Sequence, residues 1–125
     1  MVKKVINICK AIITGAGRNK GIGAEICRSF AKSGMDIYFT SFDSYDKLVA
    51  NISSEDYERT LLECKNYGVK SYFGIYDLSK KKEVEKLFDD AEKKMGKVNI
   101  LINCLCYHVY DDIVNIGEQL LDKNF

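Results

Sequence analysis

The stretch AIITGAGRNKGIG, residues 11–23, decides the fold of this chain of 125 residues. A short apolar run ends at Thr14 in a glycine-rich turn, and the turn leads directly into an amphipathic segment. Glycine tolerates backbone angles and close approaches that a Cβ forbids. Because the N–H groups and the dipole at the start of a helix favour an anion, strand, glycine turn and helix together predict a site for a dinucleotide pyrophosphate.

Apolar and polar residues alternate along the chain with two different periods. Residues 10–14, 36–41, 69–76 and 98–103 have the apolar and β-branched content of strands. Residues 21–32, 53–68 and 79–96 have helical spacing, and residues 113–120 suggest a last helix. Residues 42–52 are polar and irregular, which predicts a loop. Gly34, Gly68 and Gly96 are expected to close the three helices.

The apolar residues of the expected helices predict which faces are buried. Ile22, Ile26 and Phe30 recur every four residues in the first helix. Ser53 with Asp56 resembles a capping box for the second helix, and Ser79 can cap the third. The predicted inward faces of the second and third helices carry Tyr57, Leu61 and Cys64, and Val84, Leu87, Phe88, Ala91 and Met95.

This order of elements predicts a single α/β domain over residues 1–125. Strands joined by helical crossovers form a parallel sheet with both faces covered. Right-handed crossovers then make a doubly wound, Rossmann-type sheet the natural architecture.

Composition limits the possible partners and cofactors. A formal net charge of +1 gives no reason to expect nucleic acid or membrane partners. The odd number of cysteines, five, predicts reduced thiols in a cytoplasmic protein. Cys104 and Cys106 lack the further ligands that a zinc site needs, so we expect no metal.

Three motifs resemble those of the short-chain dehydrogenase/reductase family. Thr14-Gly15 followed by Gly21-Ile22-Gly23 resembles its Thr-Gly-x3-Gly-x-Gly fingerprint, and Asp77-Leu78 resembles its adenine contact. The strand that ends at Asn103 resembles the one leading into its Asn-Asn-Ala-Gly motif. The resemblance covers nearly the whole chain and is best to 3-oxoacyl-acyl-carrier-protein reductase-like members. It implies a cofactor site that includes Gly15, Gly21, Ile22, Gly23, Asp77, Leu78 and Asn103, to which the distribution of charge, considered below, adds Arg18, Lys20 and Ser41.

Two motifs depart from the family pattern. The turn holds five residues between Gly15 and Gly21, where the common form has three. Asn103 is followed by Cys104, Leu105 and Cys106, so only the first asparagine of its motif is kept. Leu105 is larger than the alanine that it replaces, where the backbone should pass close to the cofactor ribose.

The end of the second strand predicts the choice of cofactor. An acidic residue there would hold the ribose 2′-hydroxyl of NAD, but Ser41 and Phe42 occupy the place. Arg18 and Lys20 can pair with a 2′-phosphate. We therefore expect NADP(H) in preference to NAD(H), with the nearby Asp43 and Asp46 as solvated loop residues.

No catalytic residue is predicted in this chain. The family's tyrosine, its lysine four residues later, and the serine and asparagine that assist them correspond to positions beyond Phe125. Tyr76 and Lys80 have the Tyr-x3-Lys spacing but should not lie on one helical face, so we expect a coincidence. His108 is expected to be a loop histidine.

The family architecture implies strand order 3-2-1-4, truncated after about four strands. Residues 98–103 would then form an exposed edge, which predicts self-association or binding of a complementary chain. Three functions stay open: the cofactor-binding part of an oxidoreductase, inactive alone; a non-catalytic NADP(H)-binding regulatory or assembly module; and a degenerate remnant.

Overall fold

The computed structural model describes residues 9–42 and 54–104, which form four strands and three helices. In chain order these are β1 (Lys10–Thr14), α2 (Ile22–Lys32), β2 (Asp36–Ser41), α4 (Ser54–Lys65), β3 (Ser71–Ile75), α5 (Lys81–Met95) and β4 (Ile100–Asn103). The predicted limits of β1 and β2 are confirmed. β3 and β4 are shorter than the predicted strands because pairing with β2 and β1 begins only at Ser71 and Ile100.

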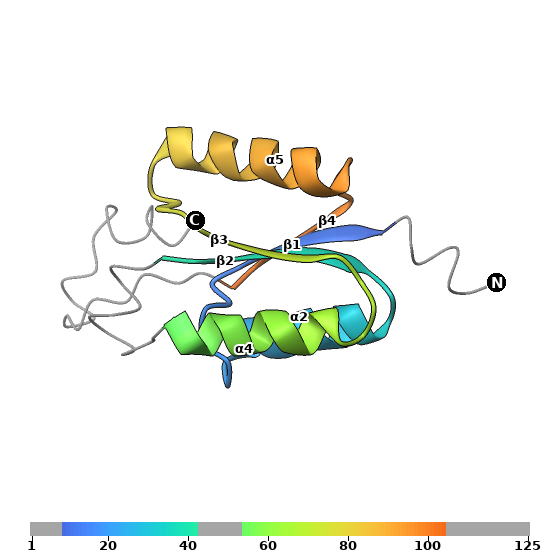
Figure 1. Ribbon diagram of the computed structural model, residues 1–125. Coiled ribbons are helices and arrows are strands. Elements are labelled where there is room, and N and C mark those ends of the chain that lie inside the picture. Colours follow the sequence, from blue (N-terminus) through green and yellow to red (C-terminus); the bar gives the residue numbers. More distant parts are fainter. Residues whose placement is uncertain (1–8, 43–53, 105–125) are drawn as a thin grey trace, which may run out of the picture.

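The strands form one parallel sheet in the order β3-β2-β1-β4, as predicted. Figure 1 shows three layers, with α2 and α4 on one face of the sheet and α5 on the other. Each helix connects two strands that run in the same direction, which is the doubly wound α/β arrangement.

Each face of the sheet has its own hydrophobic core, because successive strand side chains point to opposite faces. In β1 and β2, Ile13 and Phe39 belong to the core with α2 and α4, whereas Ile12 and Tyr38 belong to the core under α5. The predicted inward face of α5 is confirmed, since Leu87, Ala91 and Met95 are buried. The inward residues predicted for α4 also pack on the core: Tyr57, Leu61 and Cys64.

The buried face of α2 differs from the predicted one. Ile22 is 78% exposed, and the buried residues are Gly23, Ala24, Cys27 and Ala31. Ile26 and Phe30 are only partly buried. A stripe of small residues lets the helix lie close to the sheet, so the large β-branched and aromatic side chains are turned aside from the closest contact.

The helix ends confirm the glycine predictions and correct one cap. Gly34, Gly68 and Gly96 all have positive φ, which suits glycine at a helix end. The N-cap of α5 is Lys80, not Ser79. Ser79 instead donates its hydroxyl proton to Asp77 Oδ1 at 2.6 Å, and this local bond takes the hydroxyl away from the helix.

Several predictions lie outside the described residues. These are the cap at Ser53, the solvated loop aspartates Asp43 and Asp46, the thiol of Cys106, the place of Leu105, His108 and the last helix. Among the residues that the structure describes, the cysteines are free, and no cluster of side chains could hold a metal ion. No helix in these ranges is long and apolar enough to cross a membrane.

Candidate cofactor-binding site

The carboxyl ends of the parallel strands bring the predicted site residues to one edge of the sheet. Thr14 at the end of β1 lies beside Asn103 at the end of β4, and Ser41 at the end of β2 lies beside Ile75 at the end of β3. The glycine-rich turn follows the first of these ends, and Asp77 follows the last. In open α/β sheets this edge is where ligands bind.

The glycine-rich turn, residues 15–21, is folded tightly against the sheet. Gly15 has φ +68°, in the left-handed region that favours glycine. The backbone N–H of Ala16 donates to Thr40 O at 2.8 Å, which ties the turn to β2. The N–H of Gly21 donates to Arg18 O at 2.9 Å and closes the tip of the turn.

Gly23 makes the close packing of turn and helix possible. A Cβ at this position would lie 2.9 Å from Gly15 O and from the Cα and Cβ of Ala16, closer than real side chains allow. Gly21, the N-cap of α2, has no side chain to bond the first helical N–H groups. Because no side chain caps these groups, they can act as donors for an anion, and Ile22 in the same first turn is exposed.

Asn103 is held by the strand that carries the turn. Thr14 donates its hydroxyl proton to Asn103 Oδ1 at 2.6 Å, and the N–H of Cys104 donates to Thr14 O at 3.2 Å. The structure thus brings together two residues that are 89 positions apart, one from each of two predicted motifs. Ser41 is also fixed: its side chain is buried, and its carbonyl accepts the N–H of Tyr76 at 3.0 Å.

The corner between β3 and α5 holds the predicted adenine contact. Asp77 Oδ1 accepts the N–H of Ser79 at 3.1 Å as well as its hydroxyl proton. Lys80 Nζ lies 3.9 Å from Asp77 Oδ2. Leu78 is half-buried and packs against the core under α5. The Asp77 carboxylate is therefore oriented by its own turn.

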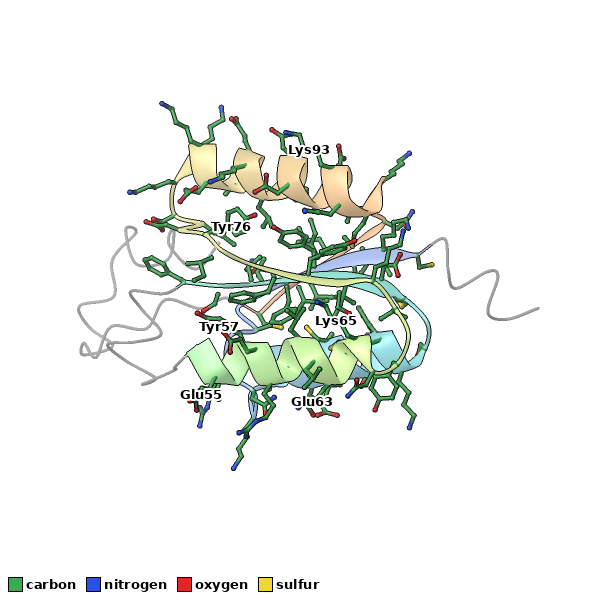
Figure 2. All side chains as sticks on the ribbon, viewed as in Figure 1. Glu55, Tyr57, Glu63, Lys65, Tyr76 and Lys93 are labelled. Atoms are coloured by element: carbon green, nitrogen blue, oxygen red, sulfur yellow. The ribbon has the colours of Figure 1, made fainter. Side chains whose placement is uncertain are left out.

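Tyr76 and Lys80 do not share a helical face, because Tyr76 follows β3 and Lys80 is the N-cap of α5. Tyr76 follows β3 and lies between the sheet and α5, as Figure 2 shows, whereas Lys80 is exposed. The Tyr76 hydroxyl donates to Asp90 Oδ2 at 2.6 Å, so the proton of its 2.7 Å bond with Tyr38 comes from Tyr38. Burial, together with these bonds, raises the pKa of Tyr76. A phenol held in this state is a poor proton donor to a substrate.

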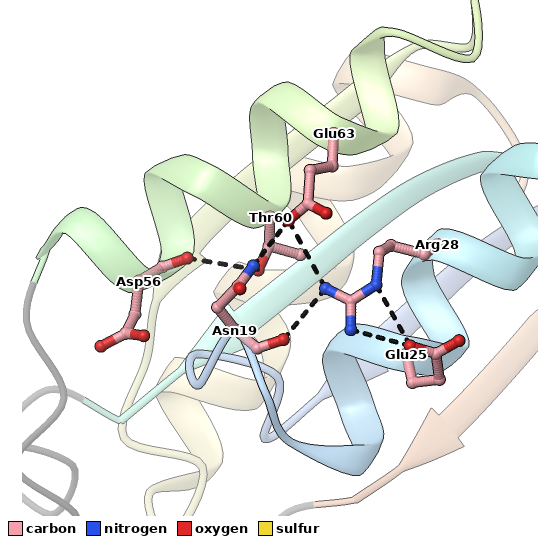
Figure 3. A network of polar contacts seen from close by, with 6 residues as sticks. All are labelled: Asn19, Glu25, Arg28, Asp56, Thr60 and Glu63. Carbon is pink, nitrogen blue, oxygen red and sulfur yellow. Dashed lines mark hydrogen bonds and ion pairs between the residues drawn. The ribbon is translucent and has the colours of Figure 1, made fainter.

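The sequence did not predict a polar network that surrounds the tip of the glycine-rich turn. Arg18 and Lys20 are exposed, but Asn19 between them contacts α4 (Figure 3). Arg28 of α2 joins the same network. No local pattern signals these contacts, because Asn19 and its α4 partners lie more than forty positions apart in the chain.

Comparisons with known proteins agree with this geometry. The sequence model of the family "short chain dehydrogenase" matches residues 10–122. An uncharacterized oxidoreductase, YjdA of Bacillus subtilis, is 29% identical over 92% of this chain and 43% of its own length. The 7alpha-hydroxysteroid dehydrogenase of Escherichia coli is 33% identical over 74% of this chain and 32% of its own length.

Solved structures give the same result. A short-chain dehydrogenase/reductase from Serratia marcescens superposes with a TM-score of 0.75 at 20% identity, over 95% of this chain and 44% of that protein, which shows the shared fold. The hydroxysteroid dehydrogenase of Escherichia coli superposes with a TM-score of 0.63 at 30% identity, over 78% of this chain and 37% of its own. This chain spans less than half the length of these relatives.

Proposed function

Because the chain belongs to the short chain dehydrogenase family, whose members bind a nicotinamide dinucleotide, we propose that residues 10–104 form the cofactor-binding part of an NADP(H)-dependent oxidoreductase. The reaction of the complete protein would be the interconversion of a carbonyl group and an alcohol. The cofactor supplies or accepts the hydride in this chemistry, and the chain's own residues bind and orient it.

The close approach at Gly23 is the observation that carries this proposal. Gly23 lets the turn pack closely against the start of α2, and Gly21 places no capping side chain on the first N–H groups of that helix. A pyrophosphate fits such a surface because each oxygen accepts an N–H bond and the helix dipole favours its charge. Ile22 would pack its exposed side chain against the nicotinamide end.

The other residues of the predicted cofactor site would hold the remaining parts of the cofactor. Asp77 and the backbone of Leu78 would contact the adenine, since the corner that carries them lies at the binding edge of the sheet. Asn103, fixed by Thr14, would lie beside the ribose next to the nicotinamide. Asp77 and Leu78 follow β3 and Asn103 ends β4, so one extended dinucleotide can span the carboxyl ends of the strands.

The preference for NADP(H) rests on charge at the end of β2. Ser41 and Phe42 provide no carboxylate to repel a 2′-phosphate, and the exposed Arg18 and Lys20 can pair with one. NAD(H) would lose these ion pairs, because its ribose carries a hydroxyl at this position.

The substrate and the turnover of the complete protein belong to the same proposal. A 3-oxoacyl thioester is the substrate class suggested by the sequence likeness. We expect residues 1–125 to bind cofactor without turning over substrate, because their one Tyr-x3-Lys lies at a strand end and its tyrosine is bonded to Asp90. The edge of β4 that no described strand pairs with would pair with another chain, either a second copy or a complementary fragment.

Calorimetric titration with NADPH and NADH tests the proposal. The protein is expected to bind NADPH about tenfold more tightly than NADH. A double change of Arg18→Ala and Lys20→Ala should abolish that preference, whereas Lys32→Ala with Lys65→Ala, which removes two exposed cations elsewhere, should keep it. Failure of the protein to bind either nucleotide would contradict the proposal and favour the degenerate remnant.

A turnover assay separates the enzyme from the binding module. NADPH oxidation is measured with acetoacetyl thioester as substrate. Binding without oxidation agrees with the proposed cofactor-binding part and also with a regulatory or assembly module. Restored oxidation after addition of the catalytic half of a related reductase would favour the former. Oxidation of NADPH by the purified chain alone would show that residues 1–125 contain an active site and would contradict the expectation of no turnover.

A further inference from the structure

The tip of the glycine-rich turn is fastened to α4 by the side chain of Asn19. Its Nδ2 donates to Thr60 Oγ1 at 2.9 Å and to Glu63 Oε1 at 2.7 Å (Figure 3). Thr60 is fully buried, and its own hydroxyl proton goes to Asp56 O at 3.2 Å. Its oxygen and the Glu63 carboxylate can therefore only accept, which fixes the orientation of the Asn19 amide.

Arg28, which lies in α2, binds the backbone carbonyl of Asn19. Its Nη1 donates to Asn19 O at 2.9 Å and lies 3.5 Å from Glu63 Oε1. Its Nη2 pairs with Glu25 Oε2 at 2.8 Å. Burial alone would lower the pKa of Arg28, but the bond to Glu25 and the charges of Glu63 and Glu25 raise it. The guanidinium is thus a permanent cation that joins α2, the turn and α4.

Asn19 lies between the two cations that are proposed to bind the 2′-phosphate of the cofactor. Arg18 and Lys20 are exposed and flank Asn19 directly in the chain. The turn is also longer than the common family form, and a longer loop samples more conformations unless it is held. Fixing Asn19 against α4 restricts the backbone of both neighbours at once.

We propose that Asn19, bound to Thr60 and Glu63 of α4, is a positioning residue that sets the selectivity for the 2′-phosphate of NADP(H) by holding Arg18 and Lys20 in place. This inference rests on the proposed function. The network converts the lengthened turn from a flexible loop into a preorganised phosphate-binding surface, and preorganisation raises affinity by reducing the entropy lost on binding.

A purely structural role of the network gives a different expectation. If Asn19 served only to pack α4 against α2, its loss would lower the free energy of unfolding and weaken both cofactors equally. If it positions the two cations, its loss weakens NADPH selectively, because NADH has no 2′-phosphate. The ratio of the two dissociation constants therefore distinguishes the roles, and a change in stability alone does not affect it.

The experiment measures the dissociation constants of NADPH and NADH for purified variants. Asn19→Ala is expected to reduce the preference for NADPH roughly three- to tenfold, the effect of losing one or two anchoring hydrogen bonds. Asn66→Ala is the matched control, since Asn66 is an exposed asparagine in the turn after α4, and it should leave the preference unchanged.

Two changes at Glu63 isolate the hydrogen bond from the charge. Glu63→Gln and Glu63→Ala both remove the negative charge, but only glutamine keeps an oxygen that can accept the Asn19 amide. Glu63→Gln should retain the NADPH preference, and Glu63→Ala should lower it as Asn19→Ala does. Equal behaviour of the two variants would overturn the inference.

Failure of the inference and failure of the proposed function give different results. If the unchanged protein prefers NADPH and Asn19→Ala keeps that preference within about twofold, or weakens both nucleotides equally, the inference is wrong and the proposed function stands. If the unchanged protein has no preference for NADPH, the proposed function is wrong as well.

Discussion

Gly23 packs against the glycine-rich turn so closely that a Cβ would not fit. Gly23→Ala is expected to lower the free energy of unfolding by about 1–3 kcal/mol, because the new methyl group would meet backbone atoms that cannot rotate away. It should also weaken NADPH binding, since the turn must shift from α2. Urea unfolding and calorimetric titration measure the two effects.

Gly21→Ala is the control for Gly23→Ala, because a Cβ at Gly21 would make a less severe contact. A Cβ at Gly21 would lie 3.2 Å from Arg18 O, a tight contact that a small shift can relieve. Its destabilisation should therefore be smaller than that of Gly23→Ala. Equal unfolding midpoints for Gly23→Ala and the unchanged protein would contradict the packing argument.

The buried thiol of Cys64 makes stability depend on pH in the alkaline range. Burial raises the pKa of Cys64 from its ordinary value of 9.0 to about 11. A raised pKa in the folded state contributes stability that is complete below about pH 9 and is lost as the pH rises towards 11. The free energy of unfolding should therefore fall by about 1–2 kcal/mol between about pH 8 and about pH 10.5 because of this thiol.

Cys64→Ala separates this thiol from the other groups that titrate in the same range. The variant has no ionisable group at this position, so its free energy of unfolding should fall less over the same interval. Urea unfolding at both pH values provides the measurement. Parallel losses in the variant and the unchanged protein would show that the thiol is not responsible.

Helix α5 is attached to the sheet by a chain of hydrogen bonds through two tyrosine hydroxyls and one carboxylate. Gly74 leaves room for these side chains, since a Cβ at Gly74 would collide with the ring of Tyr76 and touch the Tyr38 hydroxyl. Tyr38, Tyr76 and Asp90 come from β2, the end of β3 and α5. The same bonds hold Tyr76 immediately before Asp77, the residue predicted to contact the adenine.

Tyr76→Phe tests this connection between α5 and the sheet. It removes one oxygen and leaves the Asp90 carboxylate and the Tyr38 hydroxyl without the partner that joins them. The free energy of unfolding should fall by about 1–3 kcal/mol, which is the cost of unsatisfied polar groups in a partly buried site. Chemical denaturation measures the loss.

Tyr72→Phe is the matched control at the same sheet face. The Tyr72 hydroxyl makes only a 3.5 Å contact with Lys94 O in an exposed position. Its removal should change the free energy of unfolding by less than about 0.5 kcal/mol. A loss as large as that of Tyr76→Phe would mean that the hydroxyl chain does not stabilise α5.

At the scale of the whole molecule, β4 is the last strand on one side of the sheet that the described residues form. Within the described residues it pairs with β1 alone, and Leu101 is 52% exposed. An apolar strand with unpaired N–H and C=O groups is a template for another chain. We expect the protein to self-associate in sedimentation experiments as its concentration rises.

Leu101→Lys should weaken this association, because a charged side chain on the edge disfavours pairing with a second copy. Leu62→Lys is the control, since Leu62 is a 61% exposed leucine on α4, away from the sheet edge. A monomer over a wide concentration range, or an equal effect of the two lysine variants, would contradict pairing through β4.

The sequence by itself determined the order of elements and the position of the glycine-rich turn. Alternation of buried strands with helical spacing predicted the parallel sheet and gave the limits of β1 and β2 correctly, whereas the strand order was implied by the resemblance to the family. Gly15, Gly21 and Gly23 marked the turn because its close packing depends on the missing Cβ of single residues. Such signals are local, so they can be read without knowing what lies nearby in space.

Only the tertiary structure decided which side chains these elements bring together. It exposed Ile22, because the small residues of α2 make the closest contact with the sheet, and it bonded Ser79 to Asp77 instead of capping α5. It placed Asn19 against Thr60 and Glu63, positions 41 and 44 residues away. Contacts of this range depend on how the chain returns past itself in three dimensions, and no spacing within the loop encodes them.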